Sequence, residues 1–239
     1  MESYTIDPTT QCDNSLKALV RFHGGGFTEG EAEASMRPFF LELALKHGAV
    51  ILAPDYRLRP EHEMTDVIED IRCFWRWVEW DAQRILRESL QDIELDVTNL
   101  LVGGESAGGY LTMQTALLGM TGLPIKVLFV QYPAPDMAGI LGLADESHQP
   151  GAETSVLFSA KHSFSVVEDH LAALEPGKIC TRAKFGARMH LLSAMLQARR
   201  FCDLSGDNAY IDPMTSLETA GKLPPILLYH SKDDEMVSD

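Results

Sequence analysis

The stretch NLLVGGESAGG, residues 99–109, runs from apolar residues through a glycine-rich turn into a helix-like segment. Its centre, Gly104 to Gly108, fits the pattern G-x-S-x-G in the strand–turn–helix context that this pattern requires. A serine on such a sharp turn needs small neighbours, because the flanking backbones cross closely. The turn presents the Ser106 hydroxyl above the sheet, beside a helix N-terminus that stabilises negative charge. The pattern makes Ser106 a candidate nucleophile.

A second glycine-rich loop, HGGGF at residues 23–27, follows the apolar run LKALVRF. Attack by the serine on a carbonyl group would create an oxyanion, which backbone N–H groups can bind. We expect Ala107 to supply one of these groups and the loop at 24–26 to supply the others. A phosphate site fits less well, because G-K-[ST] follows neither glycine run and Glu29 replaces the last glycine of G-x-G-x-x-G.

Short apolar runs alternate with helical patterns along the chain. We expect buried strands at 17–22, 49–54, 99–104, 126–133 and 224–230. A helix is predicted from Ser35 to His47, and Thr65 is the predicted N-cap of the next. The apolar face of that second helix comprises Val67, Ile71, Phe74, Trp75, Val78 and Ile85, and its three tryptophans are predicted to be packing residues. Such alternation indicates a mostly parallel sheet with helices on both faces and ligand sites at the carboxyl ends of its strands.

Residues 139–222 interrupt this alternation. They include a helix-like run at 187–201 and no clear strand, which predicts an inserted lid over the carboxyl edge of the sheet. The predicted organisation is a core at 1–138, a lid at 139–222 and a last core segment at 223–239, which comprises a strand and the turn that follows it. The histidines of the insertion, expected to belong to the lid rather than to act as a base, are His148, His162, His170 and His190.

The composition excludes several classes of function. The net charge of −15 argues against nucleic acid or anionic membrane as a partner. No secretory signal and no long apolar run is visible, so we expect a cytoplasmic protein without a membrane span. The four cysteines lie far apart, which favours free thiols over a disulfide framework. Since H-E-x-x-H and C-x-x-C are both absent from the sequence, we expect neither a metal nor a cofactor.

Three motifs together resemble those of the hormone-sensitive-lipase-like branch of the α/β-hydrolases, a large group of carboxylesterases. They are HGGGF at 23–27, DYRLRPEH at 55–62 and GESAGG at 104–109, in that order. The resemblance implies an α/β-hydrolase fold with an inserted helical lid. It also implies that Ser106 is the nucleophile and that the oxyanion hole is formed by Gly25, Gly26 and Ala107.

The same resemblance gives expectations for the residues around the loop. His23 is expected to be a structural anchor, and the DYRL segment is expected to pack beneath the loop. This sequence departs from the family at Arg59, where alanine is usual, and at residues 63–65, where Glu-Met-Thr replaces a more apolar, proline-containing run.

The last strand and its turn, PPILLYHSKDDEMV at 224–237, resemble the family's strand followed by Asp-x-x-Val. This implies Asp234 as the triad acid, with Asp233 beside it. The family order is serine, acid, histidine, but no histidine follows Asp234 in this sequence, and His230 before it is expected to serve packing. The chain therefore looks truncated at both ends relative to the family, as a fragment or as a shortened relative without turnover.

The resulting hypothesis is a serine hydrolase that acts on carboxylic esters with small or medium acyl groups through an acyl-enzyme. Its expected partner is a small-molecule ester, and a homodimer is left open. The alternative is a non-catalytic or truncated relative that serves as a small-molecule binding protein. A third hypothesis, an interaction protein with an acidic surface, rests on the charge alone.

Overall fold

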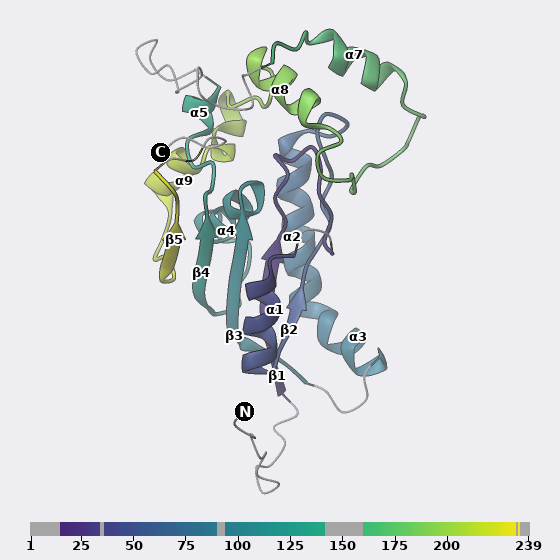
Figure 1. Cartoon of the computed structure of the whole chain (residues 1–239). Coiled ribbons are helices and arrows are strands. Elements are labelled where there is room, and N and C mark those ends of the chain that lie inside the picture. Colours follow the sequence, from purple (N-terminus) through teal and green to yellow (C-terminus); the bar gives the residue numbers. More distant parts are fainter. Residues whose placement is uncertain (1–14, 34–35, 90–93, 142–159, 233, 235–239) are drawn as a thin grey trace, which may run out of the picture.

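A single parallel sheet forms the centre of the computed structural model, which describes residues 15–33, 36–89, 94–141, 160–232 and 234. In these ranges the sheet has five strands in the order β2-β1-β3-β4-β5 (Figure 1). The strands are β1 (Ser15–Phe22), β2 (Ala49–Leu52), β3 (Glu94–Glu105), β4 (Ile125–Gln131) and β5 (Ile226–Tyr229). Each coincides with one of the five predicted apolar runs, although β3 begins five residues earlier than expected.

The strand order places the two glycine-rich loops side by side. From β1 the chain moves to β2 at one edge and then returns to the other side of β1 with β3. β1 and β3 are thus neighbours at the point where the strand order reverses, and open α/β sheets bind their ligands there, beyond the carboxyl ends of the strands. The register pairs Arg21 with Gly103 and Phe22 with Gly104. The chain segments that follow Phe22 and Glu105 therefore leave the sheet together.

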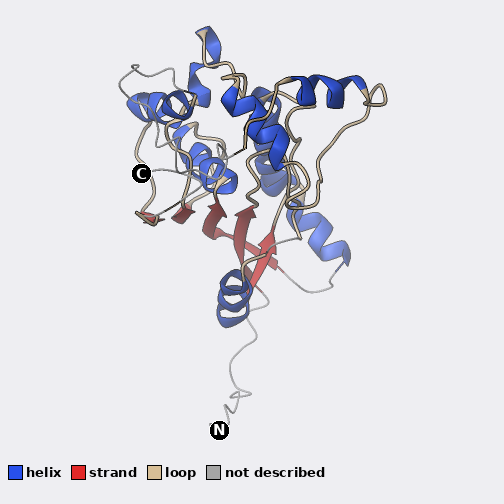
Figure 2. Ribbon diagram, turned by 45° about the horizontal axis from the view of Figure 1, so that its top comes forward, coloured by secondary structure: helices blue, strands red, loops and turns tan. Residues whose placement is uncertain are grey.

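Helices cover both faces of the sheet, as predicted (Figure 2). On one face lies α1 (Pro38–His47), and its Phe40 ring is so close to Gly103 that a Cβ there would lie 3.0 Å from it. On the other face lie α2 (Met64–Trp80) and α4 (Ala107–Leu117). Trp75 of α2 packs edge-on against Phe22 of β1, with ring centroids 6.5 Å apart, and donates a 3.1 Å hydrogen bond to Thr115 of α4.

The prediction that Thr65 is the N-cap of α2 is wrong. Glu63 is the N-cap, and the Asp66 carboxylate accepts its backbone N–H at 2.9 Å in a capping box. Two acidic side chains at the correct spacing therefore start the helix two residues earlier. The helix also ends before Ile85, which lies in the separate α3 (Ala82–Ser89) and is 38% exposed.

The three tryptophans of α2 have different environments. Trp75 is fully buried, and Trp77 packs against the core at its edge. Trp80 is 79% exposed, so the prediction that all three are packing residues is wrong for this one. Trp80 lies two positions after the buried Val78, and residues two apart do not share a helix face.

The described part of the predicted lid is helical. After α5 (Met137–Ile140) it contains α7 (Ser165–Ala172), α8 (Met189–Gln197), the 3₁₀ helix η1 (Gly206–Ile211) and α9 (Pro213–Thr219). In Figure 1, α7 and α8 lie beyond the carboxyl ends of β1 and β3. His148 falls outside the described residues, and the exact limits of the lid stay a prediction. No helix in the described ranges has the length and apolar character needed to cross a membrane.

The crossing of α4 over β1 gives a prediction about stability. A Cβ on Gly108 would overlap the carbonyl oxygen of Phe22, so Gly108→Ala must push the two backbones apart. We expect it to lower the free energy of unfolding by about 1–3 kcal/mol, the usual cost of overpacking. Gly122→Ala is the matched control, because nothing lies within 4 Å of its Cβ position. Equal urea-unfolding midpoints for the two variants would contradict the prediction.

Candidate active site

Ser106 lies on a strained turn between β3 and α4. Its φ of 53° and ψ of −118° are unusual for a residue with a side chain. The turn is held by the Ser106 N–H, which donates to Gln131 O at 3.0 Å, and by its carbonyl, which accepts from Tyr110 N at 3.0 Å. Side chains at Gly104 and Gly108 would overlap neighbouring backbone, so the motif's two glycines are both required sterically. The half-buried serine is thus presented at the carboxyl edge of the sheet.

The glycine loop after β1 runs directly beside this serine. A Cβ on Gly24 would lie 3.5 Å from Ser106 Cβ. Gly25 and Gly26 have φ values of 111° and 57°, and no described residue accepts a hydrogen bond from their N–H groups. Ala107 is the first residue of α4, so its N–H has no acceptor within the helix. The structure therefore brings the loop to the serine and leaves these three donors available.

Phe27 anchors the far end of the loop. It adopts a φ of 59° and is buried, with its ring edge-on to Tyr110 at a centroid distance of 5.2 Å. The rings of Tyr56 and Phe201 lie 6.3 and 6.0 Å away. Because these rings come from three separate parts of the chain, they offset the strain of the left-handed backbone at Phe27.

His23 has the structural role expected of it. Its ring is buried and stacks on Tyr56 with a centroid distance of 4.2 Å. The Nδ1 atom lies 2.8 Å from Gly24 O, which can only accept, so Nδ1 carries the hydrogen. Tyr56 donates to His23 O at 2.7 Å. Burial lowers the pKa of His23 to about 4, so the imidazole is neutral at pH 7.

A buried ion pair joins the strands directly below the two loops. Arg21 of β1 pairs with Glu105 of β3, and both side chains are shielded from solvent. Arg21 also donates to Ala32 O at 3.1 Å, while the carboxylate accepts from Gly24 N. Burial raises the pKa of Glu105, and the Arg21 charge opposes that rise. The pair therefore ties the residue before the serine to the start of the glycine loop.

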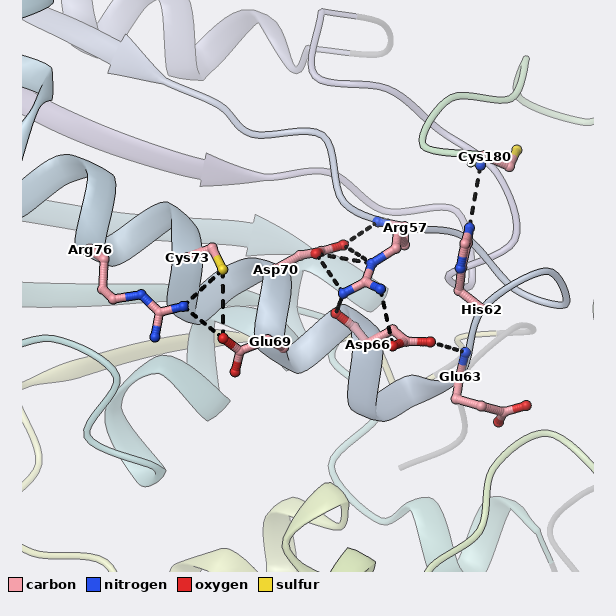
Figure 3. A network of polar contacts seen from close by, with 9 residues as sticks. All are labelled: Arg57, His62, Glu63, Asp66, Glu69, Asp70, Cys73, Arg76 and Cys180. Atoms are coloured by element: carbon pink, nitrogen blue, oxygen red, sulfur yellow. Dashed lines mark hydrogen bonds and ion pairs between the residues drawn. The ribbon is translucent and has the colours of Figure 1, made fainter. Parts of the chain in front are cut away.

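Segment 55–62 packs beneath the loop, as the DYRL motif predicted. Its Arg57 guanidinium spans two carboxylates of α2, at 2.8 Å from Asp70 and 3.0 Å from Asp66 (Figure 3). Arg59 then donates its backbone N–H to Phe27 O at 2.7 Å. These contacts connect the loop to α2 through segment 55–62.

Arg59, which stands where the family usually has alanine, contributes through its side chain as well. The guanidinium pairs with Glu63 and lies 5.6 Å from the centre of the Phe201 ring. It also donates to His62 O at 3.0 Å. The departures from the family at positions 59 and 63 are therefore complementary, since an arginine at the first is paired with a glutamate at the second.

Asp234 lies in the turn after β5, with its N–H 3.3 Å from Ser231 O. Burial raises the pKa of Tyr132, and the charges of Glu105 and Asp234 add to this effect. Tyr132 directly follows Gln131, and the Gln131 carbonyl accepts a hydrogen bond from Ser106 N. The Tyr132 N–H donates to Tyr229 O at 2.7 Å. Asp234 is thus on the same edge of the sheet as the serine, whereas Asp233 is outside the described residues.

The described histidines of the insertion have different contacts. His170 Nε2 lies 2.9 Å from Glu61 Oε1, and Glu61 also pairs with Arg188. The rings of His162 and His190 lie 6.4 Å apart. His170 therefore joins the insertion to the core. Among the residues that the structure describes, no group of three or more His, Cys, Asp or Glu side chains could hold a metal ion.

Sequence reasoning did not identify the charged residues that support the site. Arg21 and Glu29 each lie two residues outside the HGGGF motif, and Glu105 lies inside the GESAGG motif, yet all three are buried. The available signal was a charge within an apolar run, as in LKALVRF. Such a charge is seldom buried without a partner, so it predicts an ion pair but not which residue completes it.

The lowered pKa of His23 predicts a pH dependence of stability. The unfolded chain binds this proton near pH 6.5 and the folded chain only near pH 4, so protons favour unfolding between these values. We expect the free energy of unfolding to fall by about 2 kcal/mol more between pH 7 and pH 5 in the wild type than in His23→Gln. Parallel pH curves for the two proteins, measured by urea unfolding, would contradict this.

The buried pair predicts a large effect of removing one charge. Glu105→Gln leaves the Arg21 guanidinium buried without a carboxylate, which typically costs about 3–5 kcal/mol. Glu88→Gln is the control, because Glu88 pairs with Arg84 on the surface. Chemical denaturation should show a loss for the first variant and no change for the second. A loss below about 1 kcal/mol for Glu105→Gln would refute the structural role of the pair.

Comparison with known proteins gives relatives described as carboxylesterases. A probable carboxylesterase M8 of Phoma sp. is 29% identical, over 92% of this chain and 68% of its own length. A probable carboxylesterase clz11 of Cochliobolus lunatus is 28% identical, over 79% of this chain and 86% of its own. Both alignments extend well beyond the three motifs.

A solved structure and a family model agree on the fold. An α/β-hydrolase superfamily protein from Enterococcus faecalis superposes with a TM-score of 0.64 at 23% identity, covering 96% of this chain and 75% of the other. The family model described as alpha/beta hydrolase fold matches residues 19–239. This match is consistent with the resemblance carried by the three motifs, and the chain belongs to the α/β-hydrolase fold family.

Proposed function

We propose that this protein is a serine hydrolase that cleaves carboxylic esters with small or medium acyl groups. The observation that carries the proposal is the strained Ser106 turn directly beside a glycine loop with available N–H groups. In a parallel sheet this arrangement lies at the strand-order reversal, where substrates of open α/β folds bind. The relatives named as probable carboxylesterases support the same chemistry.

In the proposed reaction, the Ser106 hydroxyl attacks the ester carbonyl and loses its proton to a base. The tetrahedral oxyanion would be bound by the N–H groups of Gly25, Gly26 and Ala107, each worth about 10²–10³ in rate. Collapse expels the alcohol and leaves an acyl group on the serine, which water then removes. Asp234 is assigned the role of orienting an imidazole base and stabilising its charged form.

The surroundings of the loop suit this role. Since His23 has its pKa lowered to about 4, it is a neutral structural group and not the base. Leu192 of α8 packs so closely on Gly26 that a Cβ there would overlap it. A side chain from the insertion thus lies against one of the proposed oxyanion donors.

The proposal is tested with a fluorophosphonate probe and with p-nitrophenyl butyrate. We expect the probe to label the wild type on Ser106 and not Ser106→Ala. Because no histidine follows Asp234 in this sequence, turnover is measured with and without imidazole as an external base. Imidazole should accelerate hydrolysis by the wild type beyond the rate with Ser106→Ala, because an added base can accept the proton of the Ser106 hydroxyl.

Comparison of the wild type with Ser106→Ala separates the competing functions. Absence of labelling, together with turnover equal to that of Ser106→Ala under both conditions, would refute the hydrolase and favour the small-molecule binding protein. Asp234→Asn tests the proposed triad acid, because it should reduce turnover without preventing the protein from folding. Equal turnover for Asp234→Asn and the wild type would remove Asp234 from the proposed triad.

A further inference from the structure

Glu29 is a fully buried carboxylate within the glycine loop. Its Oε1 accepts from Gly186 N and its Oε2 from Arg188 N, both at 2.9 Å. These donors belong to the insertion, 157 and 159 residues further along the chain. A charge this deeply buried requires such compensation, and backbone N–H groups that bind a carboxylate form strong hydrogen bonds.

The backbone of Glu29 holds one of the proposed oxyanion donors. Its N–H donates to Gly25 O at 3.1 Å, and Thr28 N donates to the same carbonyl at 3.0 Å. The Glu29 carbonyl lies so close to Gly25 that a Cβ there would overlap it. A shift of Glu29 would therefore move the Gly25–Gly26 peptide, which carries the Gly26 N–H.

The segment that binds the carboxylate is itself fixed to the core. Gly30 and Ala183 form a bridge, with N–H to O distances of 2.7 and 3.1 Å. Arg182 pairs with Asp55 at 2.5 Å, and the Arg188 side chain pairs with Glu61. Residues 180–188, which we call the clasp segment, thus offer their N–H groups from a defined position.

We propose that Glu29 is a positioning residue that sets the geometry of the oxyanion loop by binding the clasp segment. This rests on the proposed function of Gly25 and Gly26. Two acceptor oxygens match two convergent N–H groups, whereas a glutamine would place its own NH₂ donor against one of them. The carboxylate at position 29 is therefore required for the geometry of the loop.

The test compares Glu29→Gln and Glu29→Ala with Glu33→Gln. Glu33 is the matched control, because it is 79% exposed at its side chain and contacts the same segment through Arg182 at 3.3 Å. Misplacement of a reactive site by about 1 Å can cost about 10²-fold in rate, so we expect both Glu29 variants to be labelled by fluorophosphonate ten- to a hundredfold more slowly. Glu33→Gln should match the wild type.

Hydrogen exchange separates positioning from general unfolding. In the Glu29 variants, amides 24–30 should exchange faster while those of β4 keep wild-type protection. Labelling within twofold of the wild type, or equal loss of protection in the loop and in β4, would overturn the proposal. If Glu29→Ala fails to fold, Glu29→Gln carries the comparison. A wild type that the probe does not label refutes the proposed function, and exchange in residues 24–30 then decides the role of Glu29 alone.

Discussion

The structure depends on a close approach of backbone at one place, where the end of β1 meets the first turn of α4. Side chains at Gly104 or Gly108 would both overlap the carbonyl oxygen of Phe22, so no Cβ fits between the two chains. This contact allows the serine turn to form and brings the glycine loop to it. The parallel order β2-β1-β3 makes the meeting unavoidable, because β1 and β3 are neighbours whose following loops start from the same edge.

Buried charged side chains then fix the conformation of the glycine loop. A run of glycines has little intrinsic preference for one conformation, so its geometry must be imposed from outside. Here Arg21 and Glu105 fix the start of the loop through the N–H of Gly24, and Glu29 fixes its end through the insertion. Each carboxylate would be costly if unpaired in the interior, and this cost makes the arrangement specific. Between the start and the end of the loop, the buried Phe27 side chain anchors it to the core.

The sequence was sufficient for the sheet, because its strands are short apolar runs between helical patterns. The two glycine motifs were sufficient to predict that the loop meets Ser106. The errors at α2 come from local competition between capping residues. At α2, Glu63 and Asp66 form a capping box that outcompetes Thr65, and the helix ends before Ile85. The partners of Arg21 and Glu29 could not be predicted, since they lie 84 and more than 150 residues away and depend on the register and on the path of the insertion. Periodicity carries no information about such distant pairs.

Residues 180–188, the clasp segment, hold the glycine loop in place as well as forming part of the insertion. A cover that only excluded water would need apolar contacts with the substrate side of the core. This segment instead supplies backbone N–H groups to Glu29, a bridge to Gly30 and ion pairs to the support below the loop. Without it, a buried carboxylate in the loop would lose both of its donors, and the loop would have to rearrange to hydrate it. The loop conformation and the docking of the insertion are therefore one cooperative unit, so substitutions at this contact act on the site without touching the serine.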